Sequence, residues 1–295
     1  MVTVQEFFDK TTFTLTYVVY DPSSKDAVVI DPVLDYDSAT GRVSHHSLKS
    51  LLTFIAAKQL SIRYILETHA HADHVSSSQF VKAEFPGAKI GISANITAVQ
   101  RVFADIFNLG RTFLADGSQF DALFSDGETF QAGTFAIKVL HIPGHTPACV
   151  AYVIDSNVFT GDSLFMPDYG TGRCDFPLGS AEALYYSVKQ KLFTLPSETR
   201  VFTGHDYLPE GRPLKFMSTI GEERRSNIHL RDETTAAEYI TFRTARDKNL
   251  DAPRLLLPSI QINIAAGNLP TPESNGVAYL KLPITPTERA KAEVT

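Results

Sequence analysis

Residues 68–74 read Thr68-His69-Ala70-His71-Ala72-Asp73-His74 and follow the apolar run 62–66 after one residue, Glu67. That run, Ile-Arg-Tyr-Ile-Leu, predicts a buried strand, so three imidazoles and a carboxylate lie in the loop at its carboxyl end. Such a loop can turn several side chains toward one point, and histidine and aspartate are common metal ligands. The stretch therefore predicts a metal site at the end of a strand.

The second half of the chain supplies three further candidate ligands, each just after a predicted strand. His145 lies in the motif PGHT, Asp162 in TGDS and His205 in TGHD. Together with the 69–74 loop, they could converge on one edge of the fold. The alternative, three unrelated surface histidines at 69–74, is disfavoured because the same chain repeats the pattern of metal-ligating residues at strand ends.

Strands and helices are predicted to alternate along both halves of the chain. In the first half, residues 12–18 and 27–30 predict a hairpin, and apolar residues at helical spacing predict helices at 48–55 and 95–107. The second half restarts with strands at 135–140, 149–154, 158–160 and 201–202, and it adds helices at 181–192, 218–229 and 234–247. Two such halves predict two sheets packed face to face and covered by helices, which is a four-layer αββα sandwich.

The composition excludes several classes of protein. Of the 295 residues, 43% are hydrophobic and 20% are charged, and the net charge of −6 comes without a long run of either sign. Disordered and fibrous classes are excluded, and nucleic acid is an unexpected partner. No apolar run approaches the roughly 20 residues of a membrane helix, and the first residues do not resemble a signal peptide.

Cysteine content and length complete these expectations. Cys149 and Cys174 are too few for a disulfide framework, so we expect a cytoplasmic protein without a membrane partner. We expect one domain over residues 1–295, with a metal-binding sandwich in 1–210 and C-terminal helices and a tail in 211–295 packed on it.

The order of the motifs THAHADH, PGHT, TGD and GHD resembles that of the metallo-β-lactamase superfamily, and it implies the same αββα sandwich. Within that superfamily, residues 168–176 (DYGTGRCDF), 204–207 (GHDY) and 222–224 (EER) resemble the persulfide dioxygenases. These enzymes oxidise glutathione persulfide to sulfite and glutathione. The tail, at 257–259 and 268–270, resembles the longer bacterial forms, so the resemblance extends over nearly the whole chain.

The resemblance implies one Fe(II) per chain, held by His69, His145 and Asp162. Two imidazoles and one carboxylate would occupy one face of an octahedral ferrous ion and leave three positions for substrate sulfur and O₂. A closed four-ligand zinc site could not accept both, and zinc, the alternative metal, has no accessible redox change. The candidate catalytic residues are these three ligands together with Asp73 and His74.

The number of metal ions stays open, because four further candidate ligands are present. His71, Asp73, His74 and His205 would complete a two-metal site, which a glyoxalase II-like thioester hydrolase would use through a bridging hydroxide. In a one-metal enzyme, Asp73 would orient a ligand imidazole, and His74 or His205 would relay protons. The GTGRCDF loop and the absence of a basic C-terminal glutathione clamp argue against the hydrolase, and the complete ligand set argues against a non-enzymatic scaffold or sensor.

The substrate side rests on the same Gly-rich loop. The resemblance places glutathione contacts on Arg173, Asp175 and Tyr207, whereas a solvated turn is the alternative for the first two. It places a further contact near Arg225 and His229, where the residue types depart from the family's and a simple surface role stays open. Arg173 would bind a glutathione carboxylate, and Asp175 would accept from the ammonium or an amide.

The two cysteines are assigned by their surroundings. Cys174 could act as a nucleophile, although O₂ chemistry at iron needs no protein thiol, and Cys149 is expected in the core. The expected partners are glutathione persulfide and O₂, and a homodimer stays open.

Overall fold

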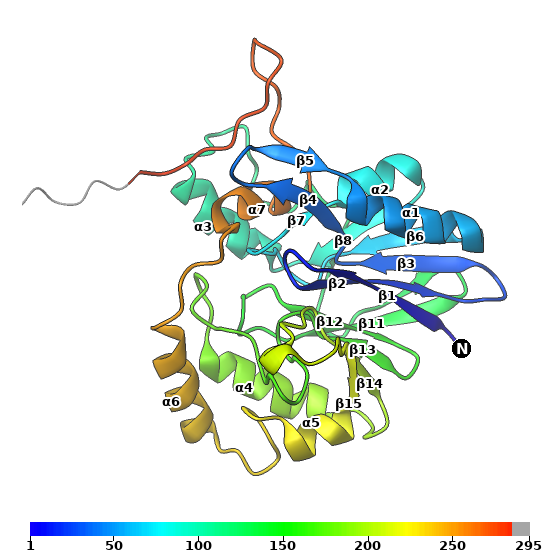
Figure 1. Ribbon diagram of the computed structural model, residues 1–295, viewed down its shortest axis with the longest axis vertical. Helices are drawn as coiled ribbons and strands as arrows, with labels where there is room; N and C mark the ends of the chain where they lie inside the picture. Colours follow the sequence, from blue (N-terminus) through cyan, green and yellow to red (C-terminus); the bar gives the residue numbers. More distant parts are fainter. Residues whose placement is uncertain (285–295) are drawn as a thin grey trace, which may run out of the picture.

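Two six-stranded sheets pack face to face at the centre of the fold, which the computed structural model describes for residues 1–284 (Figure 1). The first sheet has the order β1 (Thr3–Asp9), β2 (Thr14–Tyr20), β3 (Asp26–Ile30), β6 (Ser61–Leu66), β8 (Lys89–Ser93) and β9 (Ala122–Phe124). The second has the order β10 (Thr129–Ala132), β11 (Phe135–His141), β12 (Val150–Ile154), β13 (Asn157–Phe159), β14 (Arg200–Phe202) and β15 (Met217–Thr219). The predicted domain included the tail at 285–295, which lies outside the described residues.

Helices cover the outer face of each sheet. The first sheet packs against α1 (His46–Lys58), α2 (Ser78–Glu84) and α3 (Ile96–Ile106), and the second against α4 (Ala181–Gln190), α5 (Ile220–Ser226) and α6 (Ala236–Asp247) (Figure 1). A small sheet of β5 (Arg42–Ser44), β4 (Val33–Asp37) and β7 (Val75–Ser76) lies beside α7 (Leu256–Asn263). The predicted four-layer αββα sandwich is confirmed.

Apolar residues on both faces of the central strands explain why the layers pack in this way. In β2, Leu15, Tyr17 and Val19 face the second sheet, whereas Val18 and Tyr20 face the helices, and all five are buried. A strand that is covered on both faces needs an almost continuous apolar run, and β2 and β3 have one. The core therefore lies on both sides of the first sheet.

Parallel pairing places the polar loops at one edge of the sandwich. Strands β3, β6 and β8 are parallel, and β13 is parallel to β14, so the segments after their carboxyl ends share an edge of each sheet. Backbone hydrogen bonds join the two edges: Val150 donates to Thr68 and Leu15 donates to Gly204. Asp31 and residues 67–74 meet the segments that carry Asp162 and His205 at this edge.

The predicted elements are largely found, with one correction and one additional helix in the C-terminal part. The predicted helix at 218–229 is wrong in its first and last residues, because β15 extends the second sheet to Thr219 and α5 ends at Ser226. The expected C-terminal tail contains a further helix, α7, whose Pro258 lies in the first turn, where a missing N–H costs no helical hydrogen bond.

α7 also fixes the histidine loop of the first half. The Asn263 side chain at its end accepts a hydrogen bond from the Ser76 amide and donates to the carbonyls of His71 and His74 (2.9, 2.8 and 2.8 Å). A single amide thus satisfies three backbone groups of residues 71–76.

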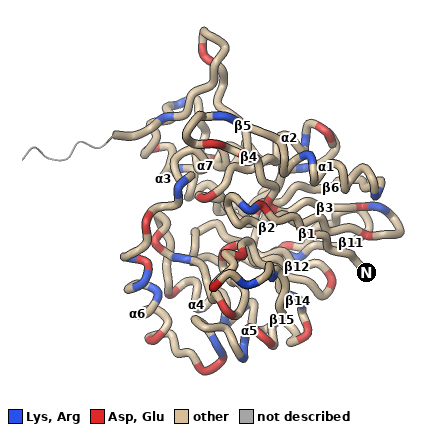
Figure 2. The backbone as a smooth tube through the Cα atoms, viewed as in Figure 1, with Lys and Arg blue, Asp and Glu red and all other residues tan. Residues whose placement is uncertain are grey.

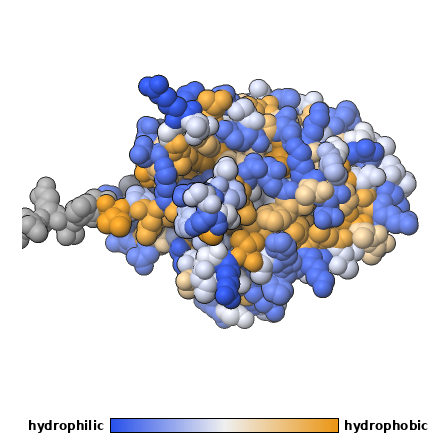
Figure 3. Space-filling model, turned by 90° about the horizontal axis from the view of Figure 1, so that it is seen from above, coloured by the Kyte–Doolittle hydropathy of each residue, from blue (hydrophilic) through white to orange (hydrophobic). Residues whose placement is uncertain are grey.

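The surface of residues 1–284 carries both charged and apolar side chains. Basic and acidic residues are mixed over the fold (Figure 2), and on the face seen from above apolar patches lie among hydrophilic residues (Figure 3). Within residues 1–284, no helix combines the length and the apolar character needed to cross a bilayer.

Candidate metal centre

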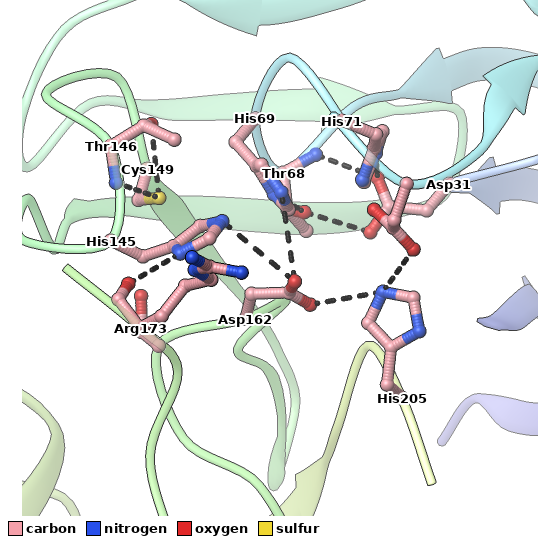
Figure 4. A network of polar contacts seen from close by, with 12 residues as sticks. Asp31, Thr68, His69, His71, His145, Thr146, Cys149, Asp162, Arg173 and His205 are labelled. Carbon is pink, nitrogen blue, oxygen red and sulfur yellow. Dashed lines mark hydrogen bonds and ion pairs between the residues drawn. The ribbon is translucent and has the colours of Figure 1, made fainter. Parts of the chain in front are cut away.

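Two histidines and an aspartate come together at this edge of the sandwich and point toward one another (Figure 4). His69 Nε2 and His145 Nε2 lie 3.9 and 3.8 Å from Asp162 Oδ2, and all three side chains are buried. These separations are too long for direct hydrogen bonds. They leave room for a cation about 2 Å from each ligand atom.

Neighbouring groups fix the tautomer of both histidines. His145 Nδ1 donates to the carbonyl oxygen of Arg173 (2.7 Å), which can only accept. The Thr68 hydroxyl donates to Asp31 (2.8 Å), so its oxygen accepts from His69 Nδ1 (3.0 Å). Each ring therefore has its proton on Nδ1 and presents the lone pair of Nε2 to the centre, as a metal ligand must.

Unpaired polar atoms support the same assignment. His69 Nε2 and Asp162 Oδ1 are buried and have no hydrogen-bond partner among residues 1–284. A buried polar atom without a partner costs about 1–3 kcal/mol, so a cluster of them is costly unless something binds there. Burial, and then the neighbouring His71 and His145, lower the pKa of His69, which keeps it neutral. These residues fit a metal ion.

A second group of candidate ligands shares Asp162 with the first. His205 Nε2 lies 3.1 Å from Asp73 Oδ2 and 3.4 Å from Asp162 Oδ1, and His74 Nδ1 lies 3.6 Å from Asp73. Burial opposes a charge on His205, but the Asp162 and Asp73 carboxylates outweigh it and raise the pKa of its imidazole. The structure thus brings together the residues that a two-metal site would use, and His71 forms a further group of candidate ligands with Asp73 and His74.

His71 is held by two carboxylates outside the first group. Its Nε2 lies 3.0 Å from Asp31 and 3.1 Å from Glu67, and since carboxylates only accept, this nitrogen carries a proton. Burial opposes a charge on His71, but Asp31 and Glu67 raise its pKa well above the usual value. The Ser76 and Ser78 hydroxyls bind the other Glu67 oxygen.

A cavity of about 400 Å³ opens beside His145, Asp162 and Asp73. Small-molecule sites in proteins begin at about 300 Å³, so the volume suits a substrate that reaches the metal from one side. Aromatic rings form one wall of this cavity, and Tyr207 stacks on Tyr169 and on His205, with centroids 4.9 and 5.3 Å apart. Burial raises the pKa of Tyr207, so its hydroxyl stays protonated.

The predicted substrate residues divide into two sets. Arg173 and Tyr207 line the cavity, and Asp175 pairs with Arg173 through two contacts of 2.6 Å. Arg225 is exposed on α5 and does not line the cavity, and His229 accepts from the Thr171 amide on the other side of the loop.

Both cysteines are buried. Cys149 packs in the core and accepts from Thr146, whereas Cys174 is 8% exposed. Burial raises the pKa of both thiols, that of Cys149 to about 12. Because the thiolate is the nucleophile, these surroundings disfavour a nucleophilic Cys174.

Sequence analysis missed several residues around the site. Asp31 and Glu67 bind His71, and Arg246 and Arg254 line the cavity. The two acids come directly after β3 and β6, where strand ends meet, and that position was the available signal. No local pattern marks the two arginines, because α6 and the segment after it reach the cavity only through the tertiary fold.

Comparison with known proteins defines the family. Residues 10–205 match the sequence profile of the metallo-beta-lactamase superfamily. The chain is 47% identical over 292 residues to a probable metallo-hydrolase of Burkholderia pseudomallei, covering 96% of this chain and 99% of the relative. It is 48% identical to glyoxylase B2 of Dictyostelium discoideum, covering 90% and 91% of the two chains.

Relatives named for a different reaction also match. Bovine mitochondrial persulfide dioxygenase ETHE1 is 34% identical over 278 residues, which cover 92% of this chain and 91% of the relative. The crystal structure of ETHE1 from Myxococcus xanthus superposes with a TM-score of 0.72 at 30% identity, covering 90% of this chain and all of that one. The fold and its histidine- and aspartate-lined edge are those of a metal-dependent αββα enzyme. The chain belongs to the metallo-β-lactamase superfamily.

Proposed function

We propose that this protein is a glutathione-dependent persulfide dioxygenase with one Fe(II) per chain. In the net reaction, glutathione persulfide, O₂ and water give glutathione and sulfite, and the terminal sulfur is oxidised while O₂ is reduced. The observation that carries the proposal is the group of His69, His145 and Asp162, whose ligand atoms face one another beside a cavity. The similarity to ETHE1 proteins over nine-tenths of the chain supports it.

The residues of this chain have distinct parts in that reaction. His69, His145 and Asp162 would hold the iron, which when bound would activate O₂ by passing it an electron, while the substrate sulfur provides in net the four electrons that reduce O₂. Asp73 lies between His74 and His205, where its ionised carboxylate can stabilise a protonated imidazole near the centre. The aromatic wall with Tyr207 excludes water from one side of the cavity.

The glutathione part of the substrate would lie along the rest of the cavity. Arg173 lines it but is paired with Asp175 and donates to the Asp251 carbonyl, so it offers only part of its guanidinium to a ligand. Arg246 and Arg254 are further cations on the same walls. A tripeptide with two carboxylates suits a cavity that carries several arginines.

A thioester hydrolase of the glyoxalase II kind is the second candidate. Two observations favour it: the group of Asp73, Asp162 and His205 is assembled beside the first, and a relative at 48% identity is named glyoxylase B2. Such an enzyme would use two metal ions and a bridging hydroxide.

Oxygen uptake separates the two candidates. We expect anaerobically purified protein with about one iron per chain to consume O₂ when glutathione persulfide is added, with sulfite formed in equal amount. S-lactoylglutathione should not be cleaved. Thioester cleavage that needs no O₂, from protein that shows no persulfide-driven uptake, would establish the hydrolase instead, and so would two zinc ions per active chain.

Replacement of Arg173 by alanine tests the substrate side. Loss of a charge-assisted hydrogen bond to substrate costs about 1.5–3 kcal/mol, so kcat/KM should fall by roughly ten- to a hundredfold. Iron content should not change, because the backbone carbonyl that binds His145 stays in place. Arg225→Ala is the matched control, since Arg225 is exposed outside the cavity. Equal efficiency of both variants and the parent would show that the Arg173 side chain does not contact substrate.

A further inference from the structure

Helix α6 contains an ion pair that is almost completely buried. Arg243 Nε and Nη2 donate to Asp247 Oδ1, at 2.9 and 2.6 Å. The Arg243 side chain is 0% exposed and that of Asp247 is 5% exposed. Charged residues at helix positions i and i+4 usually lie at the surface, and a buried pair needs further partners.

Those partners are backbone groups of one loop. Arg243 Nη1 donates to the carbonyl of Thr171 (2.9 Å), and Asp247 Oδ2 accepts from the amide of Cys174 (2.7 Å). The Tyr239 hydroxyl, one turn earlier on α6, lies 2.8 Å from Thr171 Oγ1. The helix therefore fixes both ends of the four-residue segment 171–174.

The middle of this segment contacts two of the three candidate ligands. The Arg173 carbonyl accepts the Nδ1 proton of His145, which sets the orientation and tautomer of that ring (Figure 4). Gly172 packs against the Asp162 backbone so closely that a Cβ there would collide with the Asp162 carbonyl oxygen. A shift of segment 171–174 would therefore move His145. On its other side, the segment is confined by Asp162, which packs against Gly172.

Stability does not require such an ion pair. Replacing a buried pair by apolar residues of similar volume is often neutral or stabilising, because the charges lose their hydration. This pair instead fixes the position of the backbone, because its guanidinium binds one carbonyl and its carboxylate binds one amide in a fixed geometry.

We propose that Arg243 and Asp247 are positioning residues for the metal centre: they hold segment 171–174 so that its Arg173 carbonyl orients His145 toward the metal. The inference requires His145 to be a metal ligand but does not depend on the reaction. Dioxygenase and hydrolase would both need this ligand, so failure of the proposed function would leave the inference testable.

Asp247→Asn tests this role by metal binding. The ferrous dissociation constant, measured anaerobically by competition with a chelator, should rise about 10–100-fold, as is typical when the hydrogen-bond partner of a ligand is disturbed. The d–d absorption bands of the cobalt(II)-loaded protein should shift as well, because the field of the His145 nitrogen changes.

The matched control is Asp26→Asn. Asp26 is also buried, binds the Arg63 guanidinium (2.6 Å) and accepts from a backbone amide, that of Thr134 (2.8 Å), but it lies at the opposite end of β3 from the site. This variant should lose thermal stability without a change in the ferrous dissociation constant or the cobalt spectrum. An Asp247→Asn protein that behaves in the same way would overturn the proposal.

The double variant Arg243→Met with Asp247→Leu keeps the test decisive if the single variant folds poorly. Without unpaired buried charge, its thermal midpoint should lie closer to that of the parent than the midpoint of Asp247→Asn does. Its affinity for ferrous ion should stay low, because the segment has lost its partners. Parental metal affinity in this variant would show that the pair has no positioning role.

Discussion

Replacement of His69, His145 or Asp162 by alanine is expected to remove the metal and the activity together. Each supplies one of only three ligand atoms that face the centre, and the two that remain would hold a metal at two points. Since disturbing a mere partner of a ligand costs about 10–100-fold in affinity, loss of a ligand should cost at least about 100-fold. Metal analysis of purified variants and assays with added ferrous ion measure both effects.

His71→Ala is the control for the three ligand variants. His71 Nε2 is bound to Asp31 and Glu67, and the residue is not part of the three-residue group, so this variant should keep more metal than the other three. Equal metal loss in all four variants would contradict the distinction between ligands and supporting residues, and it would favour the two-metal hydrolase.

Exchange of iron for zinc is expected to abolish persulfide-driven oxygen uptake while the fold stays intact. Zinc binds the same nitrogen and oxygen ligands but cannot donate an electron to O₂. Uptake should fall to the background rate of the assay, and circular dichroism and the thermal midpoint of the zinc form should resemble those of the iron form. The hydrolase predicts the reverse preference, in which zinc supports cleavage of S-lactoylglutathione through a bound hydroxide.

The candidate ligands could be found in the sequence because the chemistry of a metal site is concentrated in short motifs. His69, His145 and Asp162 each follow a strand that an apolar run identifies, and strands that share a sheet edge bring their loops together. The αββα layers followed from the same runs. Short strands such as β7 and β15, of two and three residues, contain too few positions for an alternation of apolar and polar residues to be recognised.

The supporting residues could not be predicted because their roles exist only in the folded chain. Residues 234–247 indicated a polar helix, yet Arg243 and Asp247 are among its most buried side chains. The resemblance placed a further glutathione contact near Arg225, but α5 exposes this residue, and Arg246 and Arg254 line the cavity instead. Burial of a charged residue is a property of tertiary packing, which neighbouring residues in the sequence do not encode.

The side-chain amide of Asn263, which binds the histidine loop, is synthesised long after that loop. The ribosome makes the histidine loop 192 residues before the side chain that binds the His71 carbonyl. At about 5–20 residues per second, that interval lasts roughly 10–40 s. During this time the nascent loop has its imidazoles but lacks its anchor, so any ion that it meets binds an unfinished set of ligands. Because Asn263 follows every candidate ligand in the sequence, the loop gains this anchor only after all of those ligands have been made.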